Sequence, residues 1–286
     1  MKSGVNTFTF FCSNAENKTD SNAVSLTNRR AFFFGNDPEI GGLQPYRAKK
    51  GKTVLVGTSV MRSVVLVCQL SNNPEEEPPQ IILIDNSRLV HQLWKQIKKY
   101  LSECDDQEIF FKGLAEFLNV TRNLYRDAPG HDRIVQVSFY NLFQRYGYSR
   151  VKSIITETIL IEQSFTHTPT FEVLRDQLAV LNAENVYVYL SNIVHCVSED
   201  VAEDVMKNIA LLNPRLSIHT DMPIDYIPRR VFLCEDSKPD SVRIVLFPGQ
   251  KRPFSFWMQP APVIENYFGR DGVVAKAQQH SFGRVD

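Results

Sequence analysis

The chain has 286 residues, of which 43% are apolar and 11% are aromatic. A sequence of this composition can bury a large core, which excludes disorder along its whole length. Lysine plus arginine and aspartate plus glutamate number 32 each, so no net charge attracts nucleic acid or an anionic membrane over long range. We therefore expect neither as a partner.

The five cysteines are an odd number and form no CxxC pair, which is typical of a reducing compartment rather than of a disulfide framework. The six histidines are dispersed without the spacing of metal ligands, so no metal site is predicted. No segment approaches the roughly 18 apolar residues that a membrane-spanning helix needs. The N-terminus also lacks the apolar region of a secretory signal. These features predict a soluble cytoplasmic protein.

Residues 1–50 are expected to form an N-terminal arm that is partly flexible. Residues 13–30 are small and polar, which is typical of a loosely packed lead-in. Residues 31–50 combine phenylalanines with a Gly/Pro turn region and are predicted to lie across the main domain, residues 51–286. Within this arm Tyr46 has two interpretations, a ligand contact or a docked core aromatic.

The main domain begins with alternating strand and helix patterns. Residues 53–59 (TVLVGTS) form a short continuous apolar run, as expected for a strand buried on both faces of a parallel sheet. Residues 60–73 suit a covering helix with Thr58 or Ser59 as its N-cap. Residues 80–87 (QIILIDNS) repeat the strand pattern, and an amphipathic helix follows. Such units pair their strands in parallel through right-handed crossovers.

A helical and aromatic insertion is predicted at about 105–158, followed by further strands at 158–164, 185–192 and 216–220 with helices between them. Residues 230–249 contain two β-rich runs joined by a polar turn too short for a crossover helix, which predicts an antiparallel hairpin. The predicted fold class is α/β, a doubly wound and mostly parallel sheet of about seven strands with a C-terminal antiparallel hairpin.

Small or polar residues stand at the carboxyl end of each predicted parallel strand, which is where open α/β sheets bind ligands. A glycine there lets backbone approach a ligand, and a carboxylate can accept both hydroxyls of a ribose. The alternatives are that the acid caps the following helix and that the asparagine after the fourth strand ties its loop to backbone amides. A Walker loop and a GxGxxG fingerprint are both absent. The residues at these ends are Gly57, Thr58, Ser59, Asp85, Asn86, Gln163, Ser164, Ser191 and Asn192.

Over roughly residues 50–250 the chain resembles the class I S-adenosylmethionine-dependent methyltransferases. Gly57 matches the first glycine of that family's GxGxG loop, whose other glycines are missing here, and Asp85 matches its ribose-binding acid. Ser191 and Asn192 occupy the place of its fourth-strand motif. The resemblance implies S-adenosylmethionine as the cofactor and methyl transfer to an unidentified acceptor.

By the same resemblance, the catalytic or acceptor contacts would come from Tyr46, Asn192 and His195. The cofactor contacts would come from Gly57, Thr58, Ser59, Asp85, Asn86, Gln163, Ser164 and Ser191. Two other interpretations stay open. The missing glycines and the absence of an acid on the first strand favour a non-catalytic binding or interaction module of the same fold. The third interpretation is a nicotinamide oxidoreductase, which would need a dinucleotide site. Binding of NAD would distinguish it from the other two.

Overall fold

The computed structural model describes residues 40, 43–71, 78–121, 131–220, 230–235 and 242–246. Most of the predicted N-terminal arm therefore lies outside the described residues, as does the chain after residue 246.

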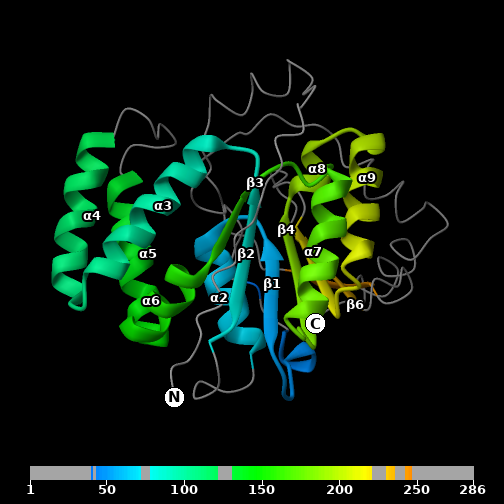
Figure 1. Ribbon diagram of the computed structural model, residues 1–286, viewed down its shortest axis with the longest axis horizontal. Coiled ribbons are helices and arrows are strands. Elements are labelled where there is room, and N and C mark those ends of the chain that lie inside the picture. The colour runs from blue at the N-terminus through cyan, green and yellow to red at the C-terminus, as the bar shows by residue number, and fades with distance from the viewer. Residues whose placement is uncertain are drawn as a thin grey trace, which may run out of the picture.

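The described chain forms one seven-stranded sheet in the order β3-β2-β1-β4-β5-β6-β7 (Figure 1). Strands β1 to β5 pair in parallel, so the predicted α/β fold on a parallel sheet is confirmed. Strand β6 pairs antiparallel with β5 and with β7. The strands are β1 (Thr53–Gly57), β2 (Gln80–Asp85), β3 (Ile159–Glu162), β4 (Asn185–Ser191), β5 (Leu216–Thr220), β6 (Arg230–Glu235) and β7 (Val242–Leu246).

The continuous apolar runs form these strands because both faces of the sheet are covered by helices. Along β1, Leu55 faces one core while Val54 and Val56 face the other. All five residues of β1 and all seven of β4 are buried. A strand with one solvated face would instead show polar residues at every second position.

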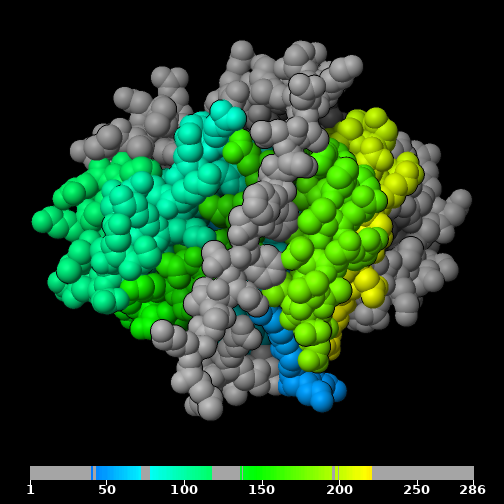
Figure 2. Space-filling model, viewed as in Figure 1, coloured from blue at the N-terminus to red at the C-terminus, as the bar shows by residue number. Residues whose placement is uncertain are grey.

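Helices cover the two faces in separate layers (Figure 1). One face carries α2 (Val60–Leu70), α3 (Arg88–Glu103) and α6 (Tyr148–Glu157). The other carries α7 (Thr168–Val180) and α9 (Glu199–Leu211), with the short helix α8 (Ile193–Cys196) beside α9. In the space-filling view α3 and α7 reach the surface on opposite sides of the visible face (Figure 2).

The predicted helical insertion divides into two parts. Helices α4 (Gln107–Thr121) and α5 (His131–Tyr146) pack beyond α3 and α6, around an aromatic cluster that includes the fully buried Phe110 and Phe139. Helix α6 instead contacts β2 and belongs to the layer that covers the sheet. Only α4 and α5 are thus added outside that layer, within the described residues. Their aromatic side chains serve as core, one of the uses that aromatic spacing predicts.

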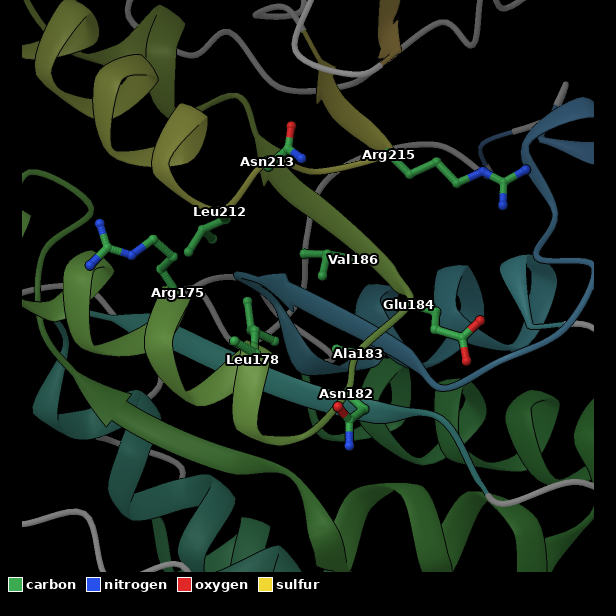
Figure 3. A pocket seen from close by; sticks show the side chains of 10 residues that line it. Arg175, Leu178, Asn182, Ala183, Glu184, Val186, Leu212, Asn213 and Arg215 are labelled. Carbon is green, nitrogen blue, oxygen red and sulfur yellow. The ribbon is translucent and has the colours of Figure 1, made fainter.

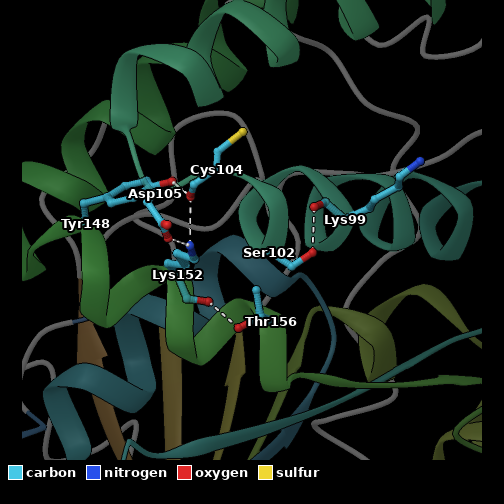
Figure 4. Close-up of polar contacts among 7 residues, drawn as sticks. All are labelled: Lys99, Ser102, Cys104, Asp105, Tyr148, Lys152 and Thr156. Carbon is cyan, nitrogen blue, oxygen red and sulfur yellow. Dashed lines mark hydrogen bonds and ion pairs between the residues drawn. The ribbon is translucent and has the colours of Figure 1, made fainter.

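Three side chains fix the start of α6 to the end of α3 (Figure 4). The Tyr148 hydroxyl and the Lys152 ammonium both donate to the Cys104 carbonyl oxygen, at 2.7 and 2.8 Å. Lys152 also pairs with Asp105 at 2.6 Å. Burial, followed by the nearby Cys104 and Asp105, raises the pKa of Tyr148 to about 12, so this hydroxyl stays protonated and donating at neutral pH. We refer to these contacts as the Cys104 latch.

Candidate functional site

The strand order reverses between β1 and β4, and the candidate site lies at the carboxyl ends of these strands and their neighbours. Gly57 pairs with Leu83 on β2 and with Tyr189 on β4. Two residues further along lie Asp85 on β2 and Ser191 on β4, and Ser191 pairs with His219 on β5. The register therefore places polar residues of three strands at one edge of the sheet, which we call the carboxyl-edge row. The alternation of core residues along these strands turns Asp85 toward the face of α2 and α3, and His219 toward the face of α7 and α9.

Gly57 is required by the neighbouring strand. A Cβ atom at this position would lie 2.9 Å from the carbonyl oxygen of Tyr189 and 3.2 Å from the Tyr189 Cβ. The next residue, Thr58, donates its backbone N–H to the same carbonyl oxygen at 3.1 Å. The group that approaches Gly57 closely is the backbone of β4, and the predicted approach of a ligand stays a prediction.

Ser59 lies just after β1 and Ser191 ends β4, the two strands that border the reversal point, and each has a φ of 53°. This left-handed conformation is uncommon for a residue with a side chain, and strained backbone is concentrated at functional sites. Ser59 is the N-cap of α2, as predicted, but its side chain makes no capping hydrogen bond. Capping geometry needs an extended backbone, which a φ of 53° does not provide.

Asp85 ends β2 with a partly buried carboxylate. Its Oδ1 accepts the backbone N–H of Ser87 at 2.7 Å, and Ser87 is the N-cap of α3. Burial raises the pKa of the Asp85 carboxyl, and the bond from Ser87, the charge of His91 and a hydrogen bond with the Thr58 side chain lower it in part. The N-cap of α3 is therefore Ser87 and not Asp85, and Asp85 instead holds the backbone of that N-cap residue.

The structure also brings Asp85 and Thr58 together across β2 and β1. An ionised carboxylate offers about four lone-pair positions, and the Ser87 amide and the Thr58 hydroxyl occupy two of them. The remaining capacity matches the two hydroxyls of a ribose. Below this carboxylate, the buried His91 donates from Nε2 to the Asp85 carbonyl oxygen at 2.7 Å, which fixes the backbone at the strand end.

The other predicted residues at this edge differ in exposure. Asn86 is exposed, whereas Gln163 and Ser164 are partly buried after β3. The Gln163 backbone donates to the Asp85 carbonyl at 3.1 Å, which joins this loop to β2. Ser164 Oγ lies 2.8 Å from Thr166 Oγ1, so its hydroxyl has a partner inside its own turn.

Asn192 is partly buried and is the N-cap residue of α8, and its Oδ1 lies 3.5 Å from Ser191 Oγ as an acceptor. Its side chain makes no capping hydrogen bond to α8. That Asn192 ties its loop to backbone amides stays a prediction. His195 follows within α8, and its side chain lies outside the described residues.

Tyr46 lies at the opposite end of the sheet from Asn192. It ends the short 3-10 helix η1 (Gln44–Tyr46), and its side chain is buried in the core shared with α2. Its carbonyl oxygen accepts the Tyr187 hydroxyl at 2.7 Å, and Ala48 bonds to the end of α2. The contact predicted between Tyr46 and the acceptor is corrected, because this residue docks the arm at the amino edge of the sheet.

His219 belongs to the carboxyl-edge row but was not among the predicted residues. It lies on β5 beside Ser191, and its side chain is fully buried. Burial lowers its pKa to about 4. The sequence signal that identifies it is a lone histidine one residue before the end of the buried run LSIHT, a strand whose carboxyl end was left out of the prediction.

A cavity of about 1010 Å³ lies at the amino edge, where α7 and α9 end and β4 and β5 begin (Figure 3). Leu178, Val186 and Leu212 line its middle, and Arg175 and Arg215 extend away from each other at its two ends. Arg175 pairs with Asp176 at 2.9 Å, and Arg215 donates to Asn185 Oδ1 at 3.0 Å. Both guanidinium groups thus have protein partners.

No protein-family model matches this chain, and no curated protein sequence matches it either. Among the described residues, no helix is both long and apolar enough to cross a bilayer. The same residues contain no group of three or more histidine, cysteine or acidic side chains arranged to hold a metal ion.

Proposed function

We propose that the carboxyl-edge row binds the adenosine part of S-adenosylmethionine and that the protein is a methyltransferase-like enzyme. The observation that carries this proposal is the convergence of the Asp85 carboxylate and the Thr58 hydroxyl beside the point where the strand order reverses. A partly buried carboxylate with unused acceptor positions suits the two hydroxyls of a ribose. A reducing cytoplasmic location, predicted from the odd number of cysteines and the lack of a CxxC pair, belongs to the same proposal.

The bound cofactor would supply an activated methyl group. Alignment of the donor with the acceptor provides most of the catalysis in such a transfer, so a strong general base is not required. Asn192 and His195 follow β4 directly and remain the candidates for contacting the acceptor. Tyr46 is no longer one of them, because it is buried at the other edge.

Thermal-shift titration with S-adenosylhomocysteine tests this proposal, because a ligand that binds only the native state raises its stability. Two substitutions separate ribose binding from bracing of the helix cap. In Asp85→Asn the amide oxygen can still accept the Ser87 N–H, but the charge is lost, whereas Asp85→Ala removes both functions. We expect a clear shift for the unmodified protein and roughly tenfold weaker binding in both variants.

Ser87→Ala is the matched control, since it removes the cap of α3 without touching the carboxylate. It should lower the melting temperature and leave the affinity unchanged. No shift of the unmodified protein at millimolar S-adenosylhomocysteine, or equal shifts in the unmodified and Asp85→Asn proteins, would contradict ribose binding by Asp85. A shift with NAD alone would favour the oxidoreductase interpretation.

A non-catalytic binding module is the second candidate, and the surroundings of Gly57 favour it. The missing Cβ of Gly57 makes room for the Tyr189 carbonyl, so this glycine is explained without a ligand. Binding of S-adenosylmethionine without methyl transfer to any member of a panel of protein, nucleic-acid and small-molecule acceptors would support the module. Formation of S-adenosylhomocysteine with one acceptor would support the enzyme.

A further inference from the structure

The cavity at the amino edge is separate from the carboxyl-edge row. It lies where α7 and α9 end, and its volume of about 1010 Å³ is at the upper end of the range for small-molecule sites. Leu178, Val186 and Leu212 form its apolar middle, and each of these side chains is at most 8% exposed. A ligand in this cavity lies at the opposite edge of the sheet from Asp85, so the two sites are independent.

One side of the cavity carries a guanidinium and a carboxylate together. Arg215 and Glu184 lie on this side, and Arg175 lies on the other (Figure 3). Glu184 directly precedes β4, Arg215 directly precedes β5, and the Arg215 N–H donates to the Val186 carbonyl oxygen at 2.8 Å. This bond makes Glu184 and Arg215 diagonal neighbours. The alternation of core residues turns both toward the same face as Val186.

Arg215 is held in place and retains unused donors. Its Nη1 donates to Asn185 Oδ1 at 3.0 Å, and the buried Asn185 is itself fixed by its bond to the Lys50 carbonyl oxygen. A guanidinium has five N–H donors, and among the described residues this is the bond that the Arg215 guanidinium makes. Because a carboxylate can accept two parallel hydrogen bonds from a guanidinium, Arg215 suits the carboxylate of a ligand.

Glu184 offers the opposite charge beside Arg215. Its side chain lies against Gly51, where a Cβ atom would come within 2.5 Å of the Glu184 Cδ and Oε2 atoms. Within the described part of the chain, the Glu184 carboxylate has no hydrogen bond and no ion pair, even with the neighbouring Arg215. An unpaired carboxylate suits an ammonium group of a ligand.

We infer that this cavity binds the zwitterion of an apolar α-amino acid. The ligand carboxylate binds Arg215, its ammonium binds Glu184, and its side chain lies on the apolar middle. An α-amino acid has both charges on one carbon, which matches two opposite charges on one side of the cavity. A dianion needs a second available cation, but Arg175 is paired with Asp176 at 2.9 Å. This inference does not depend on the proposed function.

Calorimetric titration of the full chain with L-phenylalanine tests the inference, because the cavity has room for a large apolar side chain. Phenylpropionate lacks the ammonium and phenylethylamine lacks the carboxylate. We expect each to bind at least about tenfold more weakly than phenylalanine, since each loses one charge-assisted contact. N-acetylphenylalaninamide, which imitates an internal residue of a peptide, has neither charge and should not bind.

Three matched substitutions assign the two charges to their residues. Arg215→Gln and Glu184→Gln should each weaken phenylalanine binding about tenfold. Arg215→Gln should leave the affinity for phenylethylamine unchanged, and Glu184→Gln should leave that for phenylpropionate unchanged. Arg175→Gln is the control on the other side of the cavity and should not alter phenylalanine binding, because this guanidinium already has a partner.

The analogue series on the unmodified protein decides the inference even if a variant does not fold. No binding of phenylalanine at millimolar concentration, or equal affinity for phenylalanine and either singly charged analogue, would overturn it. An equal loss in Arg175→Gln and Arg215→Gln would do the same. Tighter binding of N-acetylphenylalaninamide would also overturn it and would assign the cavity to a peptide. None of these results bears on Asp85, which is tested with S-adenosylhomocysteine.

Discussion

Among the described residues, the two edges of the parallel sheet each hold two non-glycine residues with positive φ, but the residue types differ. At the amino edge these are Asn182 and Asn213, which directly follow the C-caps of α7 and α9. Asparagine tolerates this conformation and commonly ends helices in this way. At the carboxyl edge the residues are Ser59 and Ser191. Serine does not tolerate the left-handed conformation as well as asparagine does.

Hydrogen bonding shows the same contrast. At the amino edge, Asn185 donates to the Lys50 carbonyl at 2.7 Å and accepts from Arg215 at 3.0 Å. At the carboxyl edge, the buried His219 has no partner among the described residues, and burial raises the pKa of the Asp85 carboxyl. Among the described residues the amino edge also has a buried side-chain oxygen without a partner, Oε1 of Gln80. The contrast therefore lies in the ionisable groups, because the carboxyl edge buries a carboxyl and an imidazole whose pKa values are shifted by burial. This difference is the physical reason to place the proposed nucleoside at the carboxyl edge.

The largest effect is expected where the two central strands approach each other. In Gly57→Val the new side chain would collide with the Tyr189 backbone carbonyl, which cannot rotate away. We expect a loss of about 3–4 kcal/mol in the free energy of unfolding, measured by urea denaturation. Gly113→Ala is the control, because a Cβ there would lie at an ordinary 3.6 Å from Tyr100. A loss below about 1 kcal/mol for Gly57→Val would contradict the close approach.

The unpaired histidine should make the carboxyl edge sensitive to acid. The pKa of His219 is lowered from 6.5 to about 4, so the unfolded state binds a proton in this window and the folded state does not. Stability is therefore complete above pH 6.5 and falls as the pH drops toward 4. From pH 7 to 4.5 this one residue should cost about 2.5 kcal/mol.

Urea denaturation of His219→Leu at both pH values checks this expectation. The variant should lose less stability on acidification than the unmodified protein, by about the same 2.5 kcal/mol. An identical pH dependence of the two proteins would show that His219 is not buried in its neutral form.

The amino edge should weaken when its hydrogen-bonded centre is removed. Asn185→Ala leaves the Lys50 carbonyl and the Arg215 guanidinium without this partner, and the residue is 3% exposed. We expect a loss of about 2 kcal/mol in unfolding free energy and unchanged binding of S-adenosylhomocysteine. Weaker binding in this variant would mean that the two edges are coupled.

The smallest effects concern the four described non-glycine residues with positive φ. Ser59→Gly and Ser191→Gly should each stabilise the fold by about 1 kcal/mol, because glycine adopts this conformation without strain. Asn182→Gly and Asn213→Gly should change stability by only a few tenths of a kcal/mol. Thermal melts of the four variants test this contrast. Equal gains at both edges would remove the distinction between strained serines and ordinary helix ends.

The parallel strands could be predicted because their sequences are continuous apolar runs, and only burial on both faces accounts for such runs. The meeting of Thr58 with Asp85 followed from the same pattern, since the carboxyl ends of neighbouring parallel strands share an edge. The existence of each strand is a local property of the sequence. The other features of each strand end depend on residues that are close in space and distant in sequence.

Other features of the site could not be predicted in this way. The fit of Gly57 depends on Tyr189, which is distant in sequence, and the alignment of His219 with Ser191 depends on a bulge in β4. The position of Tyr46 depends on the Tyr187 hydroxyl of β4, which is distant in sequence and bonds its carbonyl oxygen. The positive φ of Ser59 replaced the capping bond that a serine before a helix usually makes.

The Cys104 latch has a consequence for how this sequence can diverge. Tyr148 and Lys152 both hold a main-chain carbonyl at position 104, and every amino acid supplies that group. These two bonds therefore place no constraint on the side chain at position 104. Positions 148 and 152 must keep long side chains that end in a hydrogen-bond donor. Among distant relatives, the attachment of α6 to α3 should be traced through those two donors and not through the cysteine.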